Sequence, residues 1–230
     1  MSSFPTYYPH AEYRNVNLGR AAEFIDGTVL KPGETFSLHD TVGERTVANG
    51  FTKGYIINDG ILVQDLGGGV SQMATTLFNA MFFAGLEDVE HKPHSFYIDR
   101  YPIGREATVA WGSVDLRFRN DTPYGVLVDT NVVPSTPTSS GQVTVTMYST
   151  KYWDITTTTG ERYNLTKHKT RRIDSLKCHA NEGFGGFDID VVRYFTPVNG
   201  NDETRDDEVF HTTYIPSDTV ICTNPDAVDE

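Results

Sequence analysis

The chain has 230 residues, 38% of them hydrophobic and 12% aromatic, so it can bury one large core and does not have the composition of a disordered chain. Its formal net charge of -12 repels the phosphate backbone of nucleic acid, and we expect no nucleic-acid partner. No apolar run reaches the roughly 20 residues that a membrane span requires. The opening at Met1 resembles that of a trimmed chain, which leaves a secreted or membrane-anchored parent protein open.

Two helices are predicted in the first part of the chain. Between Asn17 and Ile25, apolar residues recur at the spacing of a helix that packs one face on a core. A second predicted helix runs from Gln72 to Ala84 and is apolar nearly all round, which is typical of a buried helix. Gly85 is well placed to cap its C-terminal end.

Most of the remaining chain has strand patterns. Asn58-Asp59-Gly60, whose residues tolerate positive φ, is predicted to join the two arms of a hairpin. A polar loop over 134–141 is predicted to join two later strands. The predicted strands cover residues 35–38, 52–57, 61–66, 95–101, 107–111, 116–120, 124–130 and 142–148.

These elements predict an α+β fold in which a mostly antiparallel sheet packs on the two helices. We place this domain over residues 1–151. A softer boundary follows it, and the threonine-rich and aromatic runs over residues 152–230 predict a small C-terminal β subdomain.

The glycine run Gly67-Gly68-Gly69 lies between a predicted strand and the predicted buried helix. Glycines allow a sharp backbone turn and leave room for a ligand, and the first N–H groups of a helix favour an anion or an oxyanion. Ser71 and Gln72 follow at the start of the helix, where a serine serves as an N-cap or as a nucleophile. Physical chemistry alone favours the cap. The spacing matches neither a phosphate-binding loop nor a GxSxG elbow.

A set of runs distributed over the first half of the chain resembles the VanW domain family, in the family's order and with similar spacing. The resemblance extends from about Tyr13 to Asn131, and the part that follows it resembles, more weakly, a β-rich extension found in some envelope proteins. The runs are Arg14-Asn15-Val16-Asn17-Leu18, Leu30-Lys31-Pro32-Gly33-Glu34-Thr35-Phe36-Ser37, Val42-Gly43-Glu44-Arg45-Thr46, residues 67–76, His94-Ser95 and Gly104-Arg105-Glu106-Ala107-Thr108-Val109.

The resemblance implies an envelope protein that acts on peptidoglycan or its stem peptides outside the cytoplasm. The family is named for a glycopeptide-resistance gene cluster, and some members, with the motif Gly-Gly-Gly-x-Cys-Gln, are associated with L,D-transpeptidation through a cysteine acyl-enzyme. This chain has Ser71 at that cysteine position. A helix N-terminus can activate a thiol by lowering its pKa, whereas a serine needs an adjacent general base.

Three residues are the candidate partners of Ser71. His94 is the candidate base, and we expect it at the start of a strand because it follows a proline; the alternative is a structural histidine. Glu106 could orient His94 or bind an ammonium group, or it could only pair with an arginine. Arg105 could bind a substrate carboxylate, although a solvated surface charge is the simpler interpretation.

Other residues have simpler interpretations. His91 and His94 lack a third ligand at matching spacing, so we expect no metal, and no cofactor signature is found. The pair His39-Asp40 is predicted to lie in a loop as an Asx-type turn. Trp111 and Trp153 could stack on sugar rings, but core packing is the simpler role for an aromatic side chain.

Two hypotheses follow. The first is peptidoglycan-directed acyl transfer, with Ser71 as nucleophile, His94 as base, Glu106 as orienting carboxylate and the N–H groups of residues 69–72 as oxyanion hole; the turn glycines Gly67, Gly68 and Gly69, with Gln72 and Arg105, would bind the ligand. The second is a non-catalytic domain that binds a stem peptide or glycan in the same pocket. Because the resemblance indicates an extracytoplasmic protein, we expect Cys178 and Cys222 to form a disulfide, the alternative being two buried thiols.

Overall fold

The structure is a computed structural model and describes residues 1–58, 61–176, 178 and 180–225. The helices found there are α1 (Glu12–Ile25), α2 (Leu38–Val42) and α3 (Val70–Ala84). None of these has the length and apolar character that crossing a bilayer requires. The strands are β1 (Ser2–Tyr8), β2 (Thr28–Leu30), β3 (Thr35–Ser37), β4 (Lys53–Asn58), β5 (Ile61–Leu66), β6 (Glu87–Glu90), β7 (Arg117–Arg119), β8 (Val126–Val133), β9 (Gly141–Tyr148), β10 (Trp153–Thr159), β11 (Tyr163–Thr166), β12 (Thr170–Ile173), β13 (Gly186–Pro197), β14 (Glu208–Tyr214) and β15 (Thr219–Cys222).

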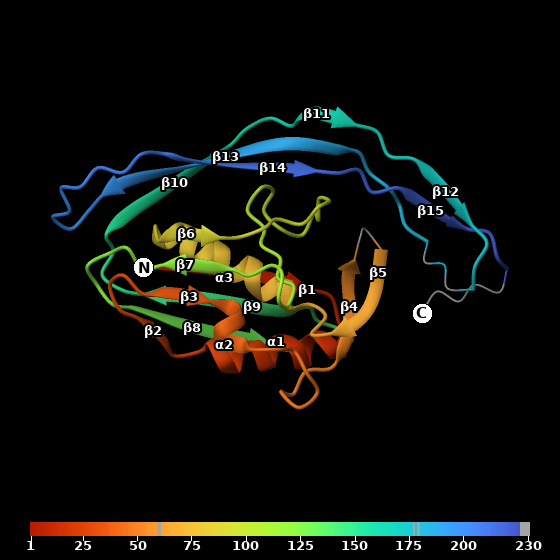
Figure 1. Cartoon of the computed structure of the whole chain (residues 1–230), viewed down its shortest axis with the longest axis horizontal. Coiled ribbons are helices and arrows are strands. Elements are labelled where there is room, and N and C mark those ends of the chain that lie inside the picture. The colour runs from red at the N-terminus through yellow and green to blue at the C-terminus, as the bar shows by residue number, and fades with distance from the viewer. Residues whose placement is uncertain (59–60, 177, 179, 226–230) are drawn as a thin grey trace.

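A four-stranded antiparallel sheet, in the order β1-β9-β8-β2, is the base of the main core. Residues alternate between buried and exposed along β8 and β9, so one face of the sheet is covered and the other faces solvent. Helix α1 packs on β8, and α3 packs on β1 and β9 as well as on α1. Figure 1 shows both helices along the sheet.

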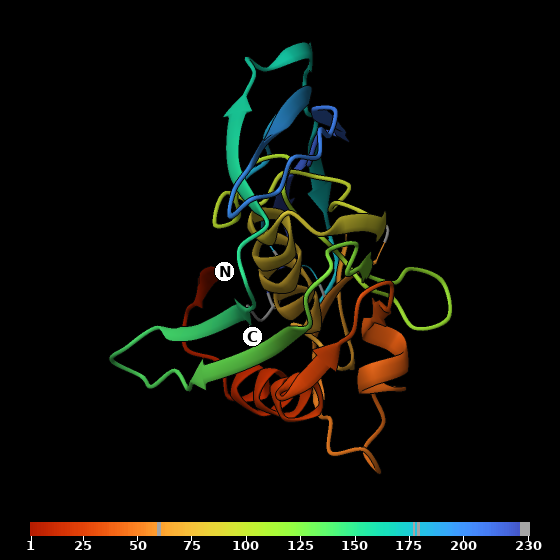
Figure 2. The same ribbon diagram turned by 90° about the vertical axis from the view of Figure 1, so that its left-hand side faces the viewer.

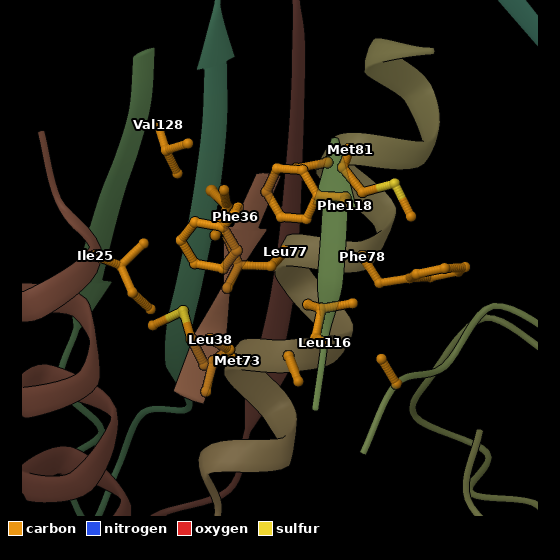
Figure 3. Packing of buried hydrophobic residues seen from close by; sticks show 14 of the residues in the cluster. Ile25, Phe36, Leu38, Met73, Leu77, Phe78, Met81, Leu116, Phe118 and Val128 are labelled. Carbon is orange, nitrogen blue, oxygen red and sulfur yellow. The ribbon is translucent and has the colours of Figure 1, made fainter. Parts of the chain in front are cut away.

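Helix α3 is the centre of the core, because it is apolar on opposite sides. Met73 and Leu77 point toward the sheet, whereas Phe78 points away from it (Figure 3). The ring centroid of Phe78 lies 4.3 Å from that of His91, in the segment that follows β6. The prediction of a buried helix is therefore confirmed, and Gly85 caps it with a φ of 75°.

The C-terminal strands cover the far side of α3. Strands β10, β13, β11 and β14 form an antiparallel sheet that arches over α3, and the arm that carries β12 and β15 extends past the β4–β5 hairpin (Figure 1). Val191 belongs to the main core, and Ile155 and Phe210 pack against it. The two parts therefore share one core in the structure, and the predicted boundary at residues 151–152 remains a prediction.

The outer end of this C-terminal arm is closed by a covalent bond. Strands β12 and β15 pair in parallel, unlike the other named strands, which pair antiparallel in the part of the chain described. Cys222 lies in β15 and forms a disulfide with Cys178, with a Cα–Cα distance of 5.7 Å. The predicted disulfide is confirmed.

The α+β fold is confirmed, but several local predictions are wrong. Residues 95–101 and 107–111 lie in irregular backbone rather than in strands, and His94 therefore does not begin a strand. Leu38 and His39 begin α2 instead of continuing a strand or a loop, because the Ser37 hydroxyl accepts a hydrogen bond from the Asp40 N–H and caps that helix. Strands β1, β2 and β6 were not predicted. Asp59 and Gly60, in the predicted hairpin turn, lie outside the described residues.

Candidate functional site

The glycine turn places the start of α3 in close contact with two other segments. Gly67 and Gly69 have φ values of 75° and 93°, which favour glycine over other residues. A Cβ atom added to Gly68 would lie 2.3 Å from the carbonyl carbon of Gly54, and one added to Gly67 would lie 2.6 Å from Cγ of Arg45. The turn therefore needs glycine both for its backbone angles and for close packing.

Ser71 is the second residue of α3 and does not cap the helix. The N-cap is Gly69, which has no side chain to accept the first N–H groups. The N–H of Val70 donates to the Gly67 carbonyl at 3.1 Å, and that of Gln72 donates to the Gly69 carbonyl at 2.9 Å. Within the described ranges, the Ser71 N–H has no acceptor. The cap predicted on physical grounds is therefore absent, and this amide at the helix start has no acceptor in the described part of the chain.

An extended segment, residues 105–109, runs antiparallel along α3 and is held by the side chains of the helix. Four helical residues and two extended residues advance by similar distances, about 6 and about 6.7 Å, so successive turns of α3 meet alternate residues of the segment. The hydrogen bonds are Asn79 Nδ2 to the Arg105 carbonyl (2.8 Å), Thr75 Oγ1 to the Ala107 carbonyl (2.9 Å), the Ala107 N–H to Thr75 Oγ1 (3.1 Å) and the Val109 N–H to Ser71 Oγ (3.4 Å).

His94 and Glu106 form a buried pair on the other edge of this segment. The Thr108 N–H donates to the Lys92 carbonyl at 2.7 Å, which places residues 92–94 opposite α3. Nδ1 of His94 lies 2.5 Å from Oε2 of Glu106, and the Glu106 side chain has no exposed surface. An ionised carboxylate can only accept hydrogen bonds, so this contact favours the histidine tautomer with its proton on Nδ1.

The C-terminal strand β14 completes this pair. The hydroxyl of Tyr214 donates to Oε1 of Glu106 at 2.9 Å and accepts the N–H of Gly104 at 2.9 Å. Burial, and then the charge of Glu106, raises the pKa of Tyr214, so the hydroxyl keeps its proton and remains a donor. Both oxygens of the buried carboxylate are therefore satisfied.

The structure brings together only some of the predicted site residues. His94 and Glu106 meet, but no hydrogen bond joins His94 to Ser71 in the described part of the chain. Gln72 is buried, and its amide accepts from Nη1 of Arg14 at 3.1 Å and donates to Oγ1 of Thr6 at 3.0 Å.

Arg105 is the predicted residue that lies farthest along the helix. Its guanidinium carbon lies 5.5 Å from the ring centroid of Phe82 and 5.0 Å from that of Phe83. Its carbonyl is bound by Asn79, eight residues beyond Ser71, which corresponds to about 12 Å along α3.

Comparison with known proteins supports the family resemblance. The family model described as VanW like protein matches residues 13–148. This chain belongs to that family. It is 35% identical over 150 residues to the "Uncharacterized protein YoaR" of Bacillus subtilis (65% of this chain, 48% of the relative). It is also 31% identical over 120 residues to the "Vancomycin B-type resistance protein VanW" of Enterococcus faecalis (49% of this chain, 43% of the relative). The chain thus spans about half the length of the curated relatives it matches. No solved structure matches it.

Within the VanW-like region, sequence reasoning missed the role of Arg45. Its side chain is only 8% exposed, and both Nη atoms are buried without a hydrogen-bond partner. Its guanidinium carbon lies 5.7 Å from the ring centroid of Trp111, whose side chain is half exposed. Desolvation by burial lowers the pKa of Arg45 to about 10, although Asp115 opposes this. The only sequence signal was its position in the run Val42-Gly43-Glu44-Arg45-Thr46.

Tyr214 was also missed, for a different reason. It lies outside residues 13–148, which the family model matches, and 108 positions after Glu106. Only the packing of β14 over the VanW-like region brings its hydroxyl to the carboxylate. No pattern in a single sequence reports a contact of this kind.

Proposed function

We propose that this chain is an extracytoplasmic domain of the cell envelope that binds the stem peptides of peptidoglycan at the glycine turn without acylating them. The observation that carries this proposal is the position of the Ser71 hydroxyl. Its oxygen accepts the Val109 N–H at one edge of residues 105–109. The candidate base His94 is hydrogen-bonded to Glu106 at the other edge of this segment. A serine without a base in hydrogen-bond contact lacks the activation that acyl transfer requires.

The start of α3 supports a binding role. The Ser71 N–H is free of acceptors among the described residues and lies where the helix dipole favours a negative group. The neighbouring turn is built from glycines that let a ligand approach the backbone closely.

The location and ligand class are supported by the family and by the disulfide. Disulfides persist in oxidising compartments outside the cytoplasm. One relative is named for vancomycin resistance, which is consistent with a role at the cell wall.

A binding and acylation experiment tests the proposal. Wild-type protein and Ser71→Ala are incubated with purified peptidoglycan and with a synthetic stem pentapeptide. We expect both proteins to co-sediment with peptidoglycan, and we expect intact-mass spectrometry to show no peptide adduct on either. An adduct on the wild type that is absent from Ser71→Ala would contradict the non-catalytic proposal and indicate acyl transfer by Ser71. Failure of both proteins to co-sediment would contradict peptidoglycan as the ligand.

Acyl transfer remains the second candidate because of the His94–Glu106–Tyr214 chain. The carboxylate holds Nδ1 of His94, as in serine hydrolases, and Nε2 has no partner among the residues described. If the domain is a decayed transpeptidase, Ser71→Cys alone should gain a covalent peptide adduct, because a thiolate at a helix N-terminus depends less on a base. Absence of an adduct in Ser71→Cys would remove this candidate.

A further inference from the structure

We propose that Arg45 and the Ser71 amide form a carboxylate-binding site beneath Trp111, and that its ligand is the free C-terminal carboxylate of a peptide. The inference rests on the proposed function in one respect, namely that the peptide is a peptidoglycan stem peptide.

Arg45 and Ser71 both lie at the N-terminal end of α3. The aliphatic part of the Arg45 side chain packs on Gly67, three residues before the start of α3. Its guanidinium lies near Trp111, two residues after Val109, whose N–H contacts the Ser71 hydroxyl. The glycine turn before Ser71 and the segment that continues from Val109 to Trp111 therefore both lie next to Arg45.

The donors at this end have no acceptors in the described part of the protein. Both Nη atoms of Arg45 are buried without partners, and the Ser71 N–H is also unpaired. Buried donors of this kind are costly unless something accepts from them, and a carboxylate accepts from a guanidinium with two parallel bonds.

The nearby carboxylate of Asp115 does not fill this role. It accepts from the Ser37 hydroxyl at 2.6 Å and from the N–H groups of His39 and Leu116 at 2.9 and 2.8 Å. No ion pair between Asp115 and Arg45 is present among the described residues. The charge of Asp115 weakens the positive potential at Arg45 but leaves the guanidinium nitrogens free to bind.

Trp111 covers the guanidinium, and the proposed site requires its ring to move aside. Its ring centroid lies 5.0 Å from that of His39, while half of its side chain faces solvent. It belongs to a tight turn closed by two hydrogen bonds between Ala110 and Val114, each 2.9 Å, with Gly112 at a φ of 73°. These bonds are internal to the turn, so an outward movement of the turn would leave them intact. Figure 2 shows the loop after residue 110 projecting beside α2.

The experiment compares two forms of one probe, a synthetic stem pentapeptide with a free C-terminal carboxylate and the same peptide with a C-terminal amide. Affinities are measured by calorimetry for the wild type, Arg45→Met and the control Arg172→Met, which alters an exposed arginine. We expect the wild type and the control to bind the acid form at least about tenfold more tightly than the amide. Arg45→Met should lose this preference, and its thermal unfolding shows whether it is folded.

Tryptophan fluorescence independently tests whether Trp111 lies over the proposed site. Trp153 is 3% exposed, so binding should change the emission of Trp111, and Trp111→Phe should remove this change.

Each other outcome overturns the inference in a distinguishable way. Equal binding of acid and amide by the wild type leaves the proposed function standing and removes the carboxylate site. A preference for the acid that survives in Arg45→Met places the carboxylate elsewhere. Absence of saturable binding for both forms overturns this inference together with the proposed stem-peptide function.

Discussion

Arg45 and Arg193 are both buried, but their surroundings are opposite. Arg193, in β13, has no exposed surface, and each of its three guanidinium nitrogens donates a hydrogen bond. Its acceptors are a carboxylate oxygen of Glu208 and the carbonyls of Phe82 and Leu86 at the C-terminal end of α3. Arg45, at the N-terminal end of the same helix, has two buried nitrogens without a partner.

This difference separates an arginine that holds the fold together from one that serves a ligand. A buried charge costs several kcal/mol unless it is paired and hydrogen-bonded. Arg193 meets this condition and joins the C-terminal sheet to α3. Arg45 does not, and stability sacrificed in a native protein is typical of a functional site.

The largest effect is expected from Arg193→Met. The substitution removes the guanidinium donors to the carbonyls of Phe82 and Leu86 and the ion pair with Glu208, which link the C-terminal sheet to the end of α3. We expect the free energy of unfolding to fall by about 3–5 kcal/mol, the range for breaking a buried ion pair. Urea denaturation measures it. A loss below about 1 kcal/mol would mean that these contacts do not hold the C-terminal sheet on α3. Arg193 would then no longer be the structural arginine with which Arg45 is compared.

A smaller effect is expected from Tyr214→Phe, which tests whether the C-terminal sheet also satisfies a buried charge in the VanW-like region. The change removes the donor to Glu106 and the acceptor of the Gly104 N–H. Leaving buried polar groups unpaired should lower the free energy of unfolding by about 1–3 kcal/mol. The control Tyr7→Phe alters a tyrosine that is 56% exposed and should change stability by less than about 0.5 kcal/mol. Equal effects of the two substitutions would contradict the buried network.

How far the sequence predicts the fold depends on where the backbone hydrogen bonds are made. Helix α3 and strands β8 and β9 make them within regular elements, so their periodicity was readable. Residues 105–109 have a β-rich composition, but they bond to side chains of α3 and to the Lys92 carbonyl instead of to a neighbouring strand. A pattern of residue types does not distinguish these two kinds of partner.

The candidate site, like the fold, could be predicted only in part from the sequence. His94 and Glu106, placed together by the family resemblance, do meet in the structure, 12 positions apart. Tyr214 reaches them from a distant strand, and Arg45 is recognised only by its two buried guanidinium nitrogens without partners, a feature that Arg105 shares in part. An unpaired donor is a property of packing, so residue type and spacing alone did not reveal it.

The smallest effect, and the one of opposite sign, is expected from Arg45→Met. Because methionine needs no hydrogen-bond partner, the free energy of unfolding at pH 7 should rise by about 1 kcal/mol, and Tm by about 2–4 °C. Arg172→Met, at an exposed arginine, should leave both unchanged.

The pH dependence of this gain follows from the pKa of Arg45. Because burial lowers this pKa from its ordinary value to about 10, the folded chain holds fewer protons than the unfolded chain between the two values. Arg45 therefore destabilises the fold fully below pH 10, and the penalty is relieved as the pH rises above 10. The advantage of Arg45→Met over the wild type should accordingly be full at pH 7 and narrow above pH 10. If Arg45→Met instead lowers stability as Arg193→Met does, Arg45 is a structural residue with partners of its own, and the contrast between the two ends of α3 no longer indicates where a ligand binds.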